Sequence, residues 1–273
     1  MKSPELKEVA KKIGFDIVGI ASMDRFSNIP PEQHPLSILP GAKSIIALGC
    51  EIPRGTFRGI EEGTLWMRAS RQVSPKYTYE LARFIEDKGW EAVPMSPLAP
   101  ERWPDGVPVA PDRVAPNVSP SLEHAAVAAG LGEIGFCRTF LSPIYGPRVS
   151  LGMIITDAPL DADPILDVSI CPGLECLECV KACPLDAISP DKTEEIIVSG
   201  KKMLCAHVNY KACRLCPNGV YLDESSMHGT PNTLTAACIR SCIVQLEETG
   251  KLQKKYKTPF RIRPAWSLGI LDE

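Results

Sequence analysis

The chain has 273 residues, 11 of them cysteines, and carries 30 Lys and Arg against 33 Asp and Glu, for a formal net charge of −3. This length allows one large domain or two small ones. The mixed charge gives no basic tract for nucleic acid or an anionic membrane, and no stretch approaches the ~18 uninterrupted apolar residues of a membrane span. A small molecule or a protein is therefore the favoured partner.

The first half of the sequence alternates helices and apolar strands. A helix is expected over residues 3–12, ended by Gly14, and it leads into an apolar strand over residues 15–21. A second buried strand is expected over residues 44–50, followed by a helix over residues 77–88.

Residues 94–120 contain eight prolines, which exclude a helix or an inner strand. A pocket-lining lid and an ordered surface loop both fit such a segment. Beyond it we expect a helix over residues 120–129, capped by Ser119, and a buried strand over residues 149–156. The polar, proline-bearing segment 160–164 is typical of a linker, so an α/β domain and then a small metal-binding module are predicted.

Nine of the eleven cysteines lie between Cys171 and Cys242, and the segment 171–184 is CPGLECLECVKACP. Its last three cysteines have the CxxCxxxCP spacing of bacterial ferredoxins, in which the cysteine before proline binds a second cluster. The first gap has four residues in place of two, which a surface loop can absorb. The sequence therefore predicts an iron–sulfur protein.

Two [4Fe–4S] clusters need eight thiolates. By the ferredoxin pattern, the first cluster is assigned to Cys171, Cys176, Cys179 and Cys242, and the second to Cys183, Cys213, Cys216 and Cys238. Cys205 is an alternative ligand for any of the last three, which leaves the spare thiol open. A helix is expected over residues 230–248, with Thr230 as its cap and Pro231 in its first position, so that Cys238 and Cys242 share one face.

Structural zinc is the competing interpretation, because CxxC pairs also form zinc sites. The CxxxCP spacing favours iron–sulfur clusters. Disulfides are disfavoured because the sequence runs directly into a helix without a signal peptide, and a reducing cytoplasm is expected. Outside this set, Cys50 is expected in the core, and for Cys137 inert packing is favoured over a cofactor contact.

Three blocks before the cysteines resemble the superfamily of epoxyqueuosine reductases and reductive dehalogenases: AGLGEIG at 129–135, SPIYGPR at 142–148 and TDAPL at 156–160. The resemblance is specific over residues 120–190. It implies an α+β fold, in which a nitroreductase-like α/β domain over residues 1–165 precedes a ferredoxin-like module with a C-terminal extension over residues 166–273.

The resemblance also implies that the first domain binds a corrinoid, cobalamin, and that electrons reach its cobalt through the two [4Fe–4S] clusters. The residues expected to line it are Gly130, Leu131, Gly132, Glu133, Gly135, Tyr145, Gly146 and Arg148. Glycines let the backbone approach a large flat ligand, but they also end helices routinely.

The catalytic acid of epoxyqueuosine reductases is an aspartate three residues before the proline of a DxxPxLE segment, and the matching segment here, 117–123, is NVSPSLE. Asn117 can hydrogen-bond a substrate but cannot deliver a proton, which puts epoxyqueuosine reduction in doubt. Asn117 and His124 are the catalytic candidates, although a structural role competes for His124. A dehalogenase-like tyrosine donor stays unassigned.

The sequence thus predicts a cytoplasmic, corrinoid-dependent reductase of a small organic substrate, with a low-potential electron donor such as ferredoxin or flavodoxin. Two alternatives stay open: an epoxyqueuosine reductase acting on tRNA, and a non-catalytic electron-transfer protein for a partner enzyme. The substrate, the physiological donor and the assembly state, with a homodimer among the options, are not fixed by the sequence.

Overall fold

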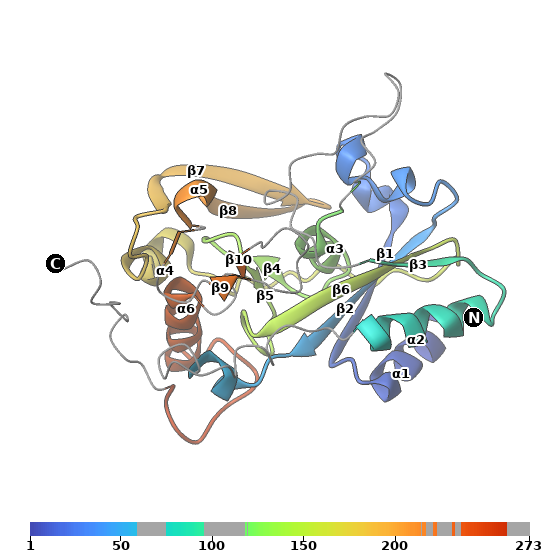
Figure 1. The fold of residues 1–273 in the computed structure, drawn as a ribbon, viewed down its shortest axis with the longest axis horizontal. Helices are drawn as coiled ribbons and strands as arrows, with labels where there is room; N and C mark the ends of the chain where they lie inside the picture. Colours follow the sequence, from blue (N-terminus) through green and yellow to red (C-terminus); the bar gives the residue numbers. More distant parts are fainter. Residues whose placement is uncertain are drawn as a thin grey trace.

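A four-stranded antiparallel sheet forms the centre of the protein (Figure 1). The computed structural model describes residues 1–58, 75–95, 118, 120–213, 215–216, 221–222, 231–232 and 236–260. The strand order is β1-β2-β6-β3, with bounds β1 Ile17–Ser22, β2 Ser44–Glu51, β6 Val149–Thr156 and β3 Ala92–Met95. The chain is therefore a mixed helix-and-sheet protein.

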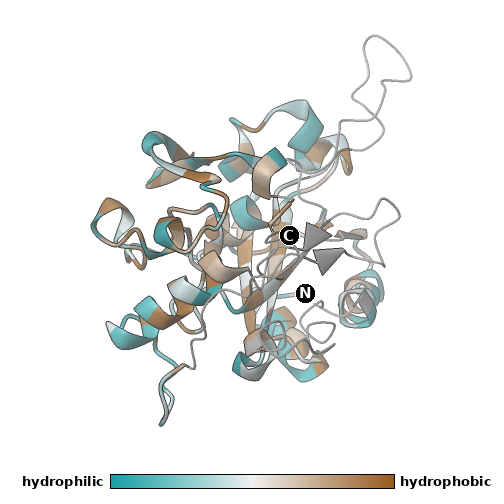
Figure 2. Cartoon of the chain, turned by 60° about the vertical axis from the view of Figure 1, so that its left-hand side comes forward, coloured by the Kyte–Doolittle hydropathy of each residue, from teal (hydrophilic) through white to brown (hydrophobic). Residues whose placement is uncertain are grey.

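Both faces of this sheet are buried, which explains why β2 is apolar at almost every position. Ile45 and Ala47 pack in the cluster that contains α3 (Leu122–Ala128). Ile46 and Leu48 pack on the opposite face, in the cluster that contains α1 (Ser3–Ile13) and α2 (Pro75–Glu86). Successive strand side chains point to opposite faces, so a strand covered on both sides shows no polar alternation. In Figure 2 the central strands are mainly in hydrophobic colours.

Smaller elements surround the sheet. They are the short helices α4 Glu178–Lys181 and α5 Tyr210–Cys213, the longer α6 Ala237–Glu248, the hairpins β4 Glu133–Ile134 with β5 Phe140–Leu141 and β7 Ile188–Val198 with β8 Lys201–Val208, and the pair β9 Tyr221–Leu222 with β10 Pro231–Asn232. Short 3-10 turns occur at Met23–Phe26, Pro31–Gln33, Pro35–Ser37, Arg54–Arg58 and Gly173–Glu175. None of the described helices is long and apolar enough to cross a bilayer.

The elements expected in the described part of the first half are present, with boundaries shifted by up to two residues: the strand expected over residues 15–21 is β1 Ile17–Ser22, and the helix expected over residues 77–88 is α2 Pro75–Glu86. The strand predicted over residues 149–156 is β6 itself. The helix predicted from residue 120 begins at Leu122, and its cap is Ser121 rather than Ser119, because the Ser121 hydroxyl accepts the His124 N–H at 3.2 Å. Pro94 lies in the edge strand β3, where a missing N–H is tolerated; residues 96–117 and 119 lie outside the described part of the chain.

The helix expected over residues 230–248 is shorter than predicted. Pro231 and Asn232 pair with β9 in extended conformation, and α6 begins only at Ala237. The prediction of a helix start at Pro231 was therefore wrong, because strand pairing takes that segment. Cys238 and Cys242 do lie one turn apart on α6, as expected.

Later segments of the chain complete the core of the earlier ones. Val198 and Met203 of the β7–β8 hairpin pack in the same cluster as α3. Ile239 and Ile243 of α6 pack with Phe57. The expected linker is also held in place: the Asp163 carboxylate accepts the Ile20 N–H at 2.8 Å and pairs with Lys7, and the Asp163 carbonyl accepts from Arg25 at 2.7 Å. The predicted boundary between two domains at residue 165 stays a prediction.

Gly19 of β1 lies against Ala129, the C-cap residue of α3, and it gives a test of this packing. A β-carbon at Gly19 would lie 2.3 Å from the Ala129 carbonyl oxygen. We expect Gly19→Ala to lower the free energy of unfolding by about 1–3 kcal/mol, because the backbone must shift. Gly41→Ala is the control, since nothing lies within 4 Å of its β-carbon position. Anaerobic urea unfolding followed by circular dichroism measures both; equal midpoints would contradict the close approach.

Candidate metal centre

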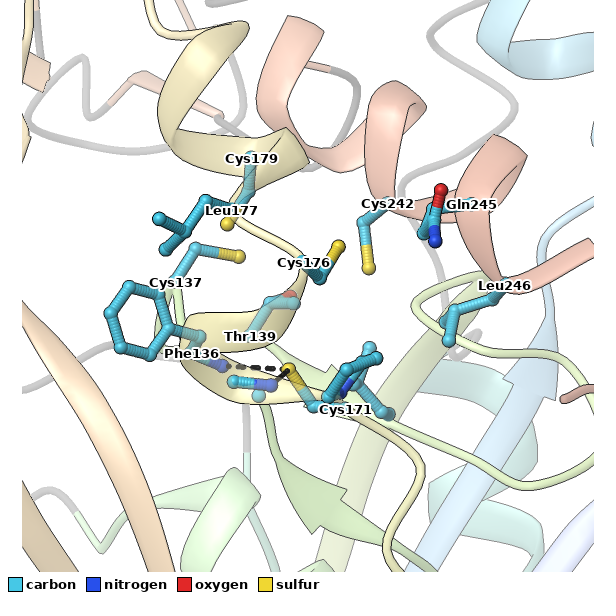
Figure 3. Close-up of a pocket in the computed structure, with 14 residues that line it drawn as sticks. Phe136, Cys137, Thr139, Cys171, Cys176, Leu177, Cys179, Cys242, Gln245 and Leu246 are labelled. Atoms are coloured by element: carbon cyan, nitrogen blue, oxygen red, sulfur yellow. Dashed lines mark hydrogen bonds between the residues drawn. The ribbon is translucent and has the colours of Figure 1, made fainter. Parts of the chain in front are cut away.

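Five thiols line one cavity at the end of the sheet where α4 and α6 meet (Figure 3). Four of them are the ligands that the sequence assigned to the first cluster, Cys171, Cys176, Cys179 and Cys242. The fifth is Cys137, from the loop of the β4–β5 hairpin. The structure thus brings together side chains from three separate parts of the sequence, arranged around a space rather than meeting at a point.

The cysteine loop curves because of two residues with positive φ. Gly173 (φ 63°) opens the turn Gly173–Glu175, and Leu177 (φ 56°) precedes α4, which carries Cys179. The 3-10 turn occupies most of the interval between Cys171 and Cys176. This is how the loop accommodates two residues more than the ferredoxin spacing.

Backbone N–H groups point at two of the sulfur atoms. Cys171 Sγ accepts from the N–H groups of Phe136 and Gly173, both at 3.4 Å, and Cys183 Sγ accepts from Ala187 N–H at 3.2 Å. Hydrogen bonds of this kind stabilise the negative form of an acceptor and tune iron–sulfur clusters. The local backbone is therefore arranged to support thiolates.

The two cysteines of α6 lie in different groups of thiols. Burial raises the pKa of the Cys242 thiol well above its ordinary value, and negative charge on Cys171, Cys179 and Cys176 raises it further. The pKa of Cys238 is likewise raised, to about 12. Burial is the largest cause, and negative charge on Cys213, Cys179, Cys183 and Cys216 adds to it. Such thiols ionise only when a metal supplies compensating positive charge.

Three of the four ligands predicted for the second cluster are packed around a small apolar core. Cys183, Cys213 and Cys238 pack against Ile188, Ala206 and Val208. Cys205 lies elsewhere: it is fully buried with Met203 in the cluster under α3, and its thiol donates to the Gly135 carbonyl at 3.5 Å. Among the described residues, no three His, Cys, Asp or Glu side chains converge closely enough to hold a single metal ion.

Glu133 ties the cysteine loop to the rest of the fold. Its carboxylate is only 4% exposed and accepts the N–H groups of Ile170 at 2.8 Å and Cys171 at 2.6 Å. Lys201 pairs with the other carboxylate oxygen at 3.3 Å and donates to the carbonyls of Leu166 and Val168. One buried ion pair therefore fixes the backbone at Cys171, the first of the predicted ligands.

The glycines predicted to line a corrinoid face protein atoms. Gly130 (φ 73°) ends α3, and a β-carbon there would lie 2.1 Å from the Pro164 carbonyl oxygen. A β-carbon on Gly132 would lie 2.0 Å from the Leu141 carbonyl oxygen, and one on Gly135 would meet the Leu141 side chain. Leu131 packs at the edge of the α3 cluster. Their role as a corrinoid lining stays a prediction.

Tyr145 and Arg148 form part of a charged contact with the later chain, whereas a β-carbon on Gly146 would lie 3.3 Å from the side chains of Leu246 and Leu252. Arg148 is fully buried, donates to Glu51 at 2.9 Å and to the Ile52 carbonyl at 3.0 Å, and lies near the Tyr256 ring. Lys254 pairs with Glu51 and lies over the Tyr145 ring. Burial raises the pKa of Glu51, but hydrogen bonds from Lys254 and Arg148 bring it below its ordinary value.

The catalytic candidates are only partly placed. His124 lies on α3, in its first turn, beside Glu123, whose carboxylate accepts from the Ser121 hydroxyl at 3.2 Å. Asn117 lies outside the described residues. Their proposed roles stay predictions.

Sequence reasoning missed the contribution of residues 133–137 to the thiol cavity. Glycines in this segment pointed to a cofactor surface, whereas Glu133, Phe136 and Cys137 contact the cysteine loop. The β7–β8 hairpin was missed too, although its two turn residues Ser199 (φ 50°) and Gly200 (φ 85°) form a dipeptide typical of turns.

With this geometry in view, similarity to known proteins can be assessed. No family profile matches the chain. An epoxyqueuosine reductase of Gloeobacter violaceus is 28% identical over 239 residues, 74% of this chain and 65% of the relative. One from a Synechococcus strain is 26% identical over 189 residues, 65% of this chain and 49% of the relative. A tetrachloroethene reductive dehalogenase of Sulfurospirillum multivorans is 35% identical over 65 residues, 23% of this chain and 13% of the relative.

The chain is a relative of the epoxyqueuosine reductases and reductive dehalogenases. It spans about half to two thirds of the length of these epoxyqueuosine reductases. The catabolic reductive dehalogenase NpRdhA, solved with 3-bromo-4-hydroxybenzoic acid, shares the fold with a TM-score of 0.56 at 18% identity, over 87% of this chain and 31% of that one. A reductive dehalogenase structure described as suggesting a mechanism for B12-dependent dehalogenation has a TM-score of 0.55 at 17% sequence identity. The match covers 86% of this chain and 31% of that one.

The Glu133 anchor can be tested directly. We expect Glu133→Ala to lower the free energy of unfolding by about 3 kcal/mol, because it leaves the Lys201 ammonium without its counter-charge and the N–H groups of Ile170 and Cys171 without their acceptor. The matched control is Glu195→Ala, which removes a more exposed pair with Lys202 and should change stability by less than about 0.5 kcal/mol. Anaerobic urea unfolding measures both variants. Equal effects would show that the anchor does not hold the loop.

Proposed function

We propose that the chain is an iron–sulfur reductase whose eight cysteines hold two [4Fe–4S] clusters. Cluster I is bound by Cys171, Cys176, Cys179 and Cys242, and cluster II by Cys183, Cys213, Cys216 and Cys238. The observation that carries this proposal is the ring of thiols around one cavity (Figure 3). A polynuclear cluster needs ligands distributed around it, whereas structural zinc needs four ligands within about 2.3 Å of one point.

The fold suits electron transfer between the two clusters. Cys238 and Cys242 are four residues apart on α6, a rise of about 6 Å along the helix axis. One helix therefore contributes a ligand to each cluster and keeps them adjacent. Bound clusters would supply one-electron chemistry, and the eight cysteines of the chain would hold them in place.

The finer proposal adds a corrinoid, a nitroreductase-like fold for residues 1–165 and a ferredoxin-like one for residues 166–273. It is supported by the shared fold with a dehalogenase described as B12-dependent. Bound cobalamin would supply a strongly reducing cobalt centre. The candidate glycines face protein atoms, so we assign no step to that centre. The substrate would be a small organic molecule, the electron donor a low-potential protein such as ferredoxin or flavodoxin, and the compartment the cytoplasm.

Epoxyqueuosine reduction on tRNA is the second candidate. The names of the curated relatives, whose alignments cover 65% and 74% of this chain, favour it. Asn117 in the place of the family's aspartate speaks against it, because an amide cannot donate the proton. An electron-transfer protein that serves a partner enzyme is the third candidate, and it requires the clusters alone.

The cluster proposal predicts the iron content. Protein purified without oxygen should hold about eight iron and eight sulfide per chain. Cys242→Ala should disturb cluster I, and Cys238→Ala should disturb cluster II, so that each variant loses the EPR signal of a different cluster. Cys50→Ala is the control, because Cys50 lies on β2 beside the Gly14 carbonyl and should keep all the iron. Iron-free, zinc-containing protein would contradict the proposal.

Cobalamin and tRNA distinguish the three candidates. Adding cobalamin to the reduced protein should give the spectrum of a base-off Co(II) species if the chain is a corrinoid reductase. No spectral change, with both clusters redox-active, would support the electron carrier instead. Formation of queuosine in a defined tRNA carrying epoxyqueuosine would support the second candidate and overturn the small-molecule proposal.

A further inference from the structure

The cavity of cluster I contains one thiol more than a four-iron cluster needs. Cys137 lines it together with the four proposed ligands, and in Figure 3 its sulfur points into the same space, toward Cys176 and Cys179. A [4Fe–4S] cluster takes four thiolates. The fifth thiol therefore lies within reach of the cluster environment without a place in the ligand set.

Cys137 also lies where the two groups of thiols meet. It packs in the apolar cluster formed by Phe57 and α6, and also in the one that contains Cys179 and Cys183. Cys238, a proposed ligand of cluster II, packs in both of these clusters. The thiol is thus placed beside cluster I on the side that faces cluster II.

The loop that carries Cys137 is held by hydrogen bonds on both sides of it. Phe136 donates to Cys171 Sγ at 3.4 Å, and its carbonyl accepts the Ala206 N–H at 2.8 Å. Arg138 donates from its side chain to the Ala206 carbonyl at 2.9 Å and from its backbone to the Gly135 carbonyl at 2.8 Å. The position of the thiol is therefore set by the hairpin.

The thiol beside it that carries the argument is Cys179. Both side chains line the same cavity and pack in one apolar cluster, and in Figure 3 the Cys137 sulfur points toward Cys179. A metal-bound thiolate has no proton and can only accept a hydrogen bond, whereas a thiol outside the ligand set keeps its S–H and can donate one. With Cys179 bound to a cluster, Cys137 would therefore be the donor and Cys179 the acceptor.

We propose that Cys137 is not a ligand but donates an S–H···S hydrogen bond to the Cys179 ligand of cluster I and raises the reduction potential of that cluster. This inference rests on the proposed function, since it requires the clusters. Reduction adds one negative charge to a cluster, and a donor to its sulfur stabilises the more negative state. The bond thus makes cluster I easier to reduce than it would be without the donor. It does not alter the iron content.

Potentiometric titration of the full chain, monitored by EPR, tests this inference in Cys137→Ala, Cys137→Ser and the control Cys50→Ala. In Cys137→Ala we expect full iron and a reduction equilibrium of cluster I about tenfold less favourable, or about 59 mV lower for one electron. Cys137→Ser keeps a hydroxyl donor and should recover most of the difference. Cys50→Ala should match the wild type, and cluster II should shift less than cluster I in every variant.

Each other outcome overturns a stated part of the account. Loss of iron or a three-iron signal in both Cys137 variants would make Cys137 a ligand. Unchanged potentials in Cys137→Ala would show that the thiol does not act on cluster I, and equal shifts in the alanine and serine variants would show that packing rather than the donor matters. Wild-type protein that binds no iron would instead refute the proposed function itself.

Discussion

The main constraint on this structure is that several ionisable thiols lie close together in buried surroundings. Cys242 and Cys238 lie on one helix, and burial, followed by negative charge on neighbouring thiols, raises the pKa of both above the ordinary value. Ionising several such thiols together in an apolar setting is unfavourable unless metal ions compensate the charge. The proposed clusters would therefore couple the folding of the segment from Cys171 to Cys242 to their own assembly.

The first half of the chain forms a rigid platform for the cysteine loop. The sheet packs α3 on one face, and α3 leads directly into the β4–β5 hairpin. From that hairpin, Glu133 holds the entry to the cysteine loop, and the Phe136 N–H reaches Cys171. The short segment 133–136 thus fixes the position of Cys171, the first of the proposed ligands, relative to the core. The proposed tuning of cluster I by Cys137 uses the same segment, one residue further on.

Local patterns predicted the elements well, and long-range contacts decided the rest. The spacing of Cys176, Cys179 and Cys183 and the four-residue interval between Cys238 and Cys242 suggested the thiol groups, because both depend on neighbouring residues alone. The role of Glu133 could not be foreseen, since its partners lie 37 and 38 residues away. Arg148 likewise pairs with Glu51, 97 residues away. This residue of the SPIYGPR block therefore makes a tertiary contact that its neighbours in the sequence do not reveal. The start of α6 was misjudged because strand pairing overrode a good helix signal at Pro231.

Anomalous X-ray scattering at the iron edge, from crystals grown without oxygen, tests the central claim most directly. The account predicts two separate iron peaks: one in the cavity bounded by Cys171, Cys176, Cys179 and Cys242, the other beside Cys183, Cys213, Cys216 and Cys238. Anomalous signal at the zinc edge alone, or a cavity of reduced thiols without metal in an intact fold, would contradict it.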